Sequence, residues 1–88
     1  MNTTYTIEGI FGAGYNRTLY WNFDENTFQE QRSLSCETDS LEHAQSVLKD
    51  RPEKEFCKKY QIVSHTFDEN EDDTKVNILE EVEGDFYK

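Results

Sequence analysis

The sequence predicts an α+β fold in which a mostly antiparallel five-stranded sheet carries one or two short helices on one face. Apolar and polar residues alternate near both ends of the chain, which is the pattern of half-buried strands. The middle of the chain instead places apolar residues at helical spacing. A length of 88 residues is that of one small domain, so we expect a single domain over 1–88 with the element order β-β-β-α-α-β-β.

Aromatic side chains supply the predicted core. Only 34% of the residues are apolar, but six Phe, five Tyr and one Trp make up 14% of the chain. Each of these rings buries a large apolar area. Such a content argues against a fully disordered chain, because disordered segments lack aromatic and β-branched residues.

Three strands are expected in the first 36 residues. The first two, over 5–11 and 19–23, alternate apolar and polar residues and are separated by a glycine-rich turn. The third, over 27–36, follows a turn of acidic and amide residues. Because the third strand is mostly polar, we expect it near an edge of the sheet.

The helical segment follows directly. Asp39 is expected to cap a helix, with Glu42 reaching back from three positions further on. The apolar residues of this helix share one face: Leu41, Ala44, Val47 and Leu48. Pro52 suits the first position of a second short helix over 52–59, which would pack Phe56 on the sheet.

Two further strands, over 62–67 and 75–82, are expected to flank an acidic loop over 68–73. Alternation sorts the fifth strand onto two faces, with Ile78, Glu80 and Val82 on one and Leu79, Glu81, Glu83 and Asp85 on the other. Same-face neighbours on a strand are about 6.6–6.8 Å apart. The acidic residues of the second face are therefore predicted to form a regular row of carboxylates.

The negative charge of the chain is concentrated in this region. Residues 61–88 hold nine acids and two bases, out of a net charge of -10 for the whole chain. DNA also presents its charges in ordered rows, so fixed carboxylates predict a mimic of nucleic-acid charge that occupies the basic cleft of a DNA- or RNA-binding protein. The predicted acidic surface consists of Glu69, Glu71, Asp72, Asp73, Glu81, Glu83 and Asp85.

In size, charge and architecture, though in no motif, the chain resembles the inhibitors that bacteriophages use against host defence systems, including anti-restriction and anti-CRISPR proteins. The resemblance implies a non-enzymatic inhibitor that works in the cytoplasm, the host cytoplasm if it is phage-encoded. Its partner would be a protein with a basic nucleic-acid-binding cleft. Direct nucleic-acid binding is not expected, because the N-terminal half offers only Arg17 and Arg32 beside its aromatic residues.

A second interpretation is a general protein-interaction module, such as an antitoxin or an assembly factor. It would bind through the aromatic residues Tyr15 and Tyr20, or by adding a strand at the sheet edge near 29–32. Reversing the charge of the acidic surface separates the two interpretations. Only the mimic would then lose its partner, and its affinity would fall steeply with salt.

No motif for catalysis, a metal or a cofactor is present, so we expect none of these. The loop that begins at Asp68 fails as a calcium site, because Asp73 stands where a Gly is needed and Leu79 where a bidentate Glu belongs. The soft metal ligands have no close spacing: Cys36, Cys57, His43 and His65. The two cysteines fit free thiols in a reducing cytoplasm, and their spacing leaves a single disulfide open. No apolar run has the length of a membrane span.

Overall fold

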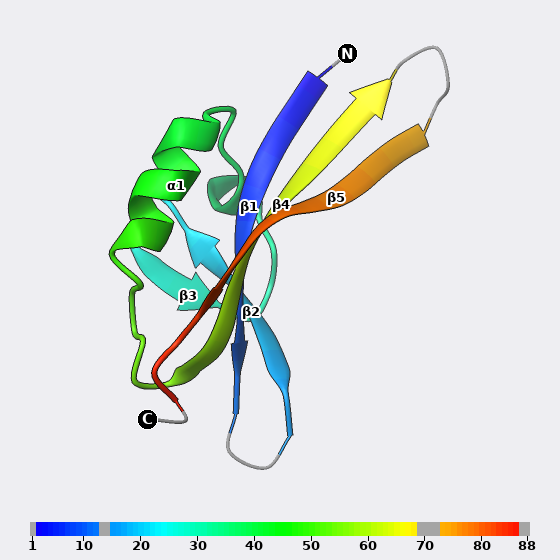
Figure 1. The fold of residues 1–88 in the computed structure, drawn as a ribbon. Helices are drawn as coiled ribbons and strands as arrows, with labels where there is room; N and C mark the ends of the chain where they lie inside the picture. The colour runs from blue at the N-terminus through cyan, green and yellow to red at the C-terminus, as the bar shows by residue number, and fades with distance from the viewer. Residues whose placement is uncertain (1, 13–14, 69–72, 87–88) are drawn as a thin grey trace.

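The computed structural model describes residues 2–12, 15–68 and 73–86, and it confirms the predicted fold class (Figure 1). Its elements are β1 (Asn2–Phe11), β2 (Arg17–Asn22), β3 (Thr27–Gln29), the 3-10 turn η1 (Leu34–Cys36), α1 (Leu41–Lys49), β4 (Cys57–Asp68) and β5 (Asp73–Glu83). All strand pairs are antiparallel, and the five strands lie in the order β3-β2-β1-β4-β5. No helix in the described part of the chain has the length and apolar character needed to span a membrane.

The core lies between α1 and one face of the sheet, which we call the helix face. Ile7 on β1 and its register partner Ile62 on β4 are fully buried there, together with Tyr60 and with Ala44 of α1. Burying such a large apolar side chain contributes about 1.5–3 kcal/mol, so these contacts hold α1 on the sheet. The sheet face opposite α1 is called the outer face below.

An aromatic cluster closes the core on the β3 side. Phe28 on β3 makes edge-to-face contacts with Phe11 and with Trp21, at centroid distances of 5.0 and 5.1 Å. Such pairs contribute about 0.5–1.5 kcal/mol beyond their burial. The cluster shows how a chain with few apolar residues still builds a packed interior.

The helix begins one residue later than predicted. Ser40, not Asp39, is the N-cap, and its hydroxyl accepts a hydrogen bond of 3.2 Å from the backbone N–H of His43. The reason is that Thr38 still pairs with Tyr5 of β1 through two backbone hydrogen bonds, so the chain is extended there. Helical geometry can start only after this bridge ends.

The predicted second helix over 52–59 is wrong. Residues 52–56 form turns, and Arg51 and Glu53 adopt left-handed backbone conformations with φ of 44° and 54°, which a helix does not tolerate. β4 already begins at Cys57, because the segment that follows pairs with β1 on one side and with β5 on the other. The two-sided hydrogen bonding of a central strand outweighs the local helical pattern.

The third strand is shorter than predicted, although its edge position is confirmed. β3 ends at Gln29, whose side-chain amide donates to the carbonyl of Gln31 at 2.6 Å and to the hydroxyl of Ser33 at 3.2 Å. These bonds turn the chain away from the sheet. Cys36, at the end of η1, becomes buried.

An irregularity in the β4–β5 pairing changes the faces of β5. Ile62 is paired with Glu80, whereas the next residue, Val63, is paired with Ile78, so Leu79 is an extra residue of a β-bulge. Directly paired residues share a face and successive residues alternate. Ile78 therefore lies on the outer face, and its predicted grouping with Glu80 and Val82 is wrong.

Candidate protein-binding surface

The predicted row of carboxylates is present in part. Glu81 and Glu83 are paired with Gln61 and Lys59 of β4, so both lie on the outer face as predicted. Asp85 does not continue the row, because β5 ends at Glu83. The backbone N–H of Asp85 donates to the carbonyl of Lys54 at 2.8 Å, and its carboxylate forms an ion pair of 3.2 Å with Arg51.

The remaining acidic residues do not form an isolated block of negative charge. Glu81 lies 3.4 Å from the ammonium group of Lys59, and both side chains are about half-exposed. Such a surface pair contributes about 0–1 kcal/mol, but it offsets the charge locally. Glu80 lies on the helix face, where it accepts a hydrogen bond of 2.9 Å from Gln45.

Three of the predicted residues, Glu69, Glu71 and Asp72, lie outside the described residues. Asp73 is the first residue of β5 and is paired with Asp68 at the end of the β4–β5 hairpin. The structure therefore places the described acidic residues at the two ends of β5, with Asp73 at one end and Glu81 and Glu83 at the other.

The two tyrosines of the alternative interpretation lie in different environments. Tyr15 lies between β1 and β2 and is 72% exposed. Tyr20 is half-buried in β2, between its register partners Glu8 on β1 and Gln29 on β3. Only Tyr15 presents most of its ring to a partner.

A group of exposed apolar residues lies on the β4–β5 hairpin. Val76, Ile78 and Phe67 are 58%, 55% and 39% exposed, and Leu79 at the bulge is 44% exposed. We call these four residues the distal strip. The register places Phe67, Val76 and Ile78 together on the outer face, since they pair with Thr74, His65 and Val63. Alternation along the strand identifies these residues as apolar, but it does not predict that they are exposed.

The position of the distal strip makes its exposure informative. β5 is an outer strand of the sheet, and no strand pairs with its second edge within the described ranges. Figure 1 shows the β4–β5 hairpin extending away from α1, which accounts for the elongated shape of 46 × 25 × 21 Å. Outer strands are normally protected by charges, prolines or bulges against pairing with other chains. Between Thr74 and Leu79, Lys75 is the only charged residue.

Burial and hydrogen bonds constrain the two cysteines and His65. Cys36 and Cys57 are buried free thiols, so the disulfide that the spacing left open is not formed. Burial raises the pKa of the Cys57 thiol, and its Sγ donates to the carbonyl of Lys59 at 3.2 Å. Burial, together with the charge of Arg32, lowers the pKa of His65, whose Nε2 lies 3.2 Å from the hydroxyl of Thr6.

Potential metal ligands are not clustered in the part of the chain that the structure describes. Among residues 2–12, 15–68 and 73–86, no three His, Cys, Asp or Glu side chains are arranged to hold a metal ion.

Comparison with protein-family models, with curated proteins and with solved structures gave no match. The function is therefore inferred from the chemistry of the surface.

Proposed function

We propose that this protein is a non-enzymatic binding domain that captures an extended segment of a partner protein as a sixth strand along β5. The observation that carries the proposal is the exposure of Val76, Ile78 and Leu79 on an outer strand. Strand addition satisfies the backbone hydrogen-bonding groups of an open edge, while alternate side chains provide specificity.

The distal strip supplies enough apolar area to support such binding. Fully burying a Val, Ile or Leu side chain is worth about 1.5–3 kcal/mol, and each of these three is about half-exposed. Covering them would contribute about 2–4 kcal/mol before the costs of association. Phe67 adds an aromatic contact of the kind that often anchors an interface. A moderate-affinity interface of strand length is consistent with these magnitudes.

The charge of β5 indicates the chemistry of the partner. The strand carries four acidic residues and one base, Lys75, and its acidic residues lie at the two ends of the apolar portion. A second copy of β5 would bring like charges together, which disfavours self-association. We infer that the partner segment is apolar at its centre and basic at its ends. A basic nucleic-acid-binding protein of the host, as the charge pattern predicts, is one partner of this kind, and blocking it would make this protein an inhibitor.

The test compares Ile78→Lys with a matched control. Leu34→Lys adds the same charge at an apolar residue that is 87% exposed and lies in η1, away from the distal strip. Affinity isolation from the native host identifies the partner, and the affinity of each purified variant for it is then measured. We expect the wild type and Leu34→Lys to bind alike, and Ile78→Lys to bind at least tenfold more weakly, because a charge placed in the apolar contact must be desolvated.

Protection of the β5 backbone amides from hydrogen exchange in the complex would support strand addition directly. Unchanged binding by Ile78→Lys would overturn the proposal. If Glu81→Lys and Glu83→Lys together abolish binding while Ile78→Lys does not, the protein binds through charge alone, as a mimic would.

A further inference from the structure

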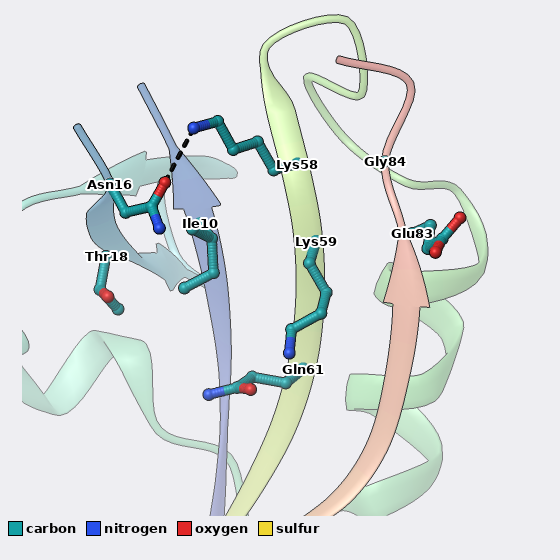
Figure 2. A pocket seen from close by; sticks show the side chains of 8 residues that line it. All are labelled: Ile10, Asn16, Thr18, Lys58, Lys59, Gln61, Glu83 and Gly84. Atoms are coloured by element: carbon teal, nitrogen blue, oxygen red, sulfur yellow. Dashed lines mark hydrogen bonds between the residues drawn. The ribbon is translucent and has the colours of Figure 1, made fainter. Parts of the chain in front are cut away.

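A second feature of the outer face lies at the opposite end of the sheet from the distal strip. It is a cleft of about 640 Å³, a volume within the usual range for small-molecule sites. Its lining residues come from β1, the β1–β2 connection, β2, β4, the end of β5 and the residue that follows β5: Ile10, Asn16, Thr18, Lys58, Lys59, Gln61, Glu83 and Gly84 (Figure 2). Lys59 and Phe67 are eight residues apart on β4, or about 27 Å at the rise of a strand.

Two consecutive lysines line this cleft because of a second β-bulge. In a regular strand Lys58 and Lys59 would point to opposite faces. The register shifts here, since Ile10 is paired with Lys59 while Phe11 is paired with Cys57, so Lys58 is the extra residue. A bulge redirects a side chain, and both lysines therefore reach the outer face.

Contacts hold the first lysine in the cleft. The ammonium group of Lys58 donates to the side-chain carbonyl of Asn16 at 2.8 Å and lies 5.2 Å from the centre of the Phe86 ring. The second, Lys59, is anchored by the weaker surface pair with Glu81. Figure 2 shows Lys58 directed towards Asn16, Lys59 running along β4 towards Gln61, and the carboxylate of Glu83 pointing away from both amines.

Two of the nine basic residues of a chain with net charge -10 line the cleft, beside neutral hydrogen-bonding groups of Asn16, Thr18 and Gln61. Ile10, half-buried between them, provides an apolar wall. One carboxylate, that of Glu83, also lines it, and Glu81 pairs with Lys59 at 3.4 Å. Ammonium groups bind phosphate and carboxylate groups through charge-assisted hydrogen bonds. An exposed pair such as Lys59–Glu81 contributes only about 0–1 kcal/mol, so Lys59 can exchange it for a ligand.

We propose that this cleft binds a small organic anion, with the flexible side chains of Lys58 and Lys59 turning towards its phosphate or carboxylate group and with its apolar part against Ile10. This site is separate from the distal strip and does not depend on the proposed protein partner. The donors of Asn16, Thr18 and Gln61 would orient the ligand by neutral hydrogen bonds.

The test uses phenyl phosphate as the probe, with inorganic phosphate, benzoate and phenol for comparison. Binding to the full chain is followed by NMR through the backbone amides of Thr18, Lys58, Lys59 and Gln61. We expect phenyl phosphate or benzoate to shift these amides, and whichever binds more tightly identifies the head group. Phenol should bind at least tenfold more weakly, because it lacks the charge that the lysines recognise.

Lysine-to-methionine variants locate the site, because methionine keeps an unbranched apolar stem. Lys58→Met and Lys59→Met should each weaken binding about fivefold, whereas Lys75→Met, with the same loss of charge on the distal part of β5, should change it by less than twofold. Lys59→Met keeps the test valid if Lys58→Met fails to fold, since Lys59 makes only a surface pair. The proposal is overturned if neither anion binds at millimolar concentration, if phenol binds equally, or if Lys59→Met leaves the affinity unchanged.

Discussion

Gly84 follows β5 and lies against the backbone at the start of β4, and its replacement by alanine is expected to destabilise the protein strongly. A Cβ atom at this position would lie 2.0 Å from the carbonyl oxygen of Cys57 and 2.7 Å from its carbonyl carbon. Both are backbone atoms of β4, so no side-chain rotation relieves the overlap. Either the start of β4 or the segment after β5 must move.

The size of the effect follows from the bonds that this movement would disturb. The N–H of Gly84 donates to the carbonyl of Lys58 at 3.1 Å, and the N–H of Phe86 donates to the carbonyl of Cys57 at 3.2 Å. Each such bond contributes about 0.5–1.5 kcal/mol, and overpacking adds about 1–3 kcal/mol. We expect Gly84→Ala to lower the free energy of unfolding by about 2–4 kcal/mol, a large part of the stability of a small domain.

Urea unfolding followed by tryptophan fluorescence measures this change, because Trp21 is the only tryptophan and is buried in the core. Gly9→Ala is the comparison: its nearest contacts are the ring edges of Phe11 and Phe28, which are side-chain atoms able to shift. Gly84→Ala should lower the free energy of unfolding more than Gly9→Ala does. If Gly84→Ala lowers it by an equal or smaller amount, contact with the backbone of Cys57 is not what makes the position sensitive.

Two further predictions concern the helix and the pH dependence. Ser40→Ala should lower the free energy of unfolding by about 1 kcal/mol, because the hydrogen bond from the N–H of His43 to the Ser40 hydroxyl is lost. Asp39→Ala should change it by less than half of that. The reverse order in urea unfolding would mean that Asp39 is the cap. Because burial and Arg32 lower the pKa of His65 below its ordinary 6.5, while Glu37 and Glu8 act less strongly in the opposite direction, the unfolded chain binds the proton more readily. The contribution of neutral His65 to stability should be complete above about pH 6.5 and be lost as the pH falls below that value. His65→Gln should therefore flatten this part of the curve of unfolding free energy against pH. A variant that keeps the full slope would show that another group causes it.

The fold class was predictable because the strands that form the core bury apolar side chains. Ile7 of β1 and Trp21 of β2 each belong to an alternating run and to the core cluster that includes Ala44 of α1, and this burial is what the period of two reports. The segment over 52–59 was not predictable in the same way. Its helical spacing is real, but Tyr60 is buried as a strand residue and Phe56 is left 64% exposed, because pairing with two neighbouring strands decides the conformation.

The candidate surface was predictable only where the strand is regular. Glu81 and Glu83 share a face as expected, since no irregularity separates them. One extra residue, Leu79, reverses the faces of everything before it, and local sequence contains no clear signal for such a bulge. For the same reason the sequence did not reveal that Ile78 is exposed or that Lys58 and Lys59 share a cleft.

The bulge at Leu79 also divides β5 into two parts with different physical roles. After it, Glu80, Glu81 and Glu83 place charges on the strand, which discourages unselective pairing at that part of the edge. Before it, Val76 and Ile78 leave apolar side chains exposed and Lys75 is the only basic residue, so a partner strand can pair there. In the proposed complex the carboxylates would attract a basic partner over long range and raise the association rate, while the distal strip would slow dissociation. In that complex the acidic charge and the exposed apolar residues would act on different steps of one binding event, which would account for the presence of both on the same strand.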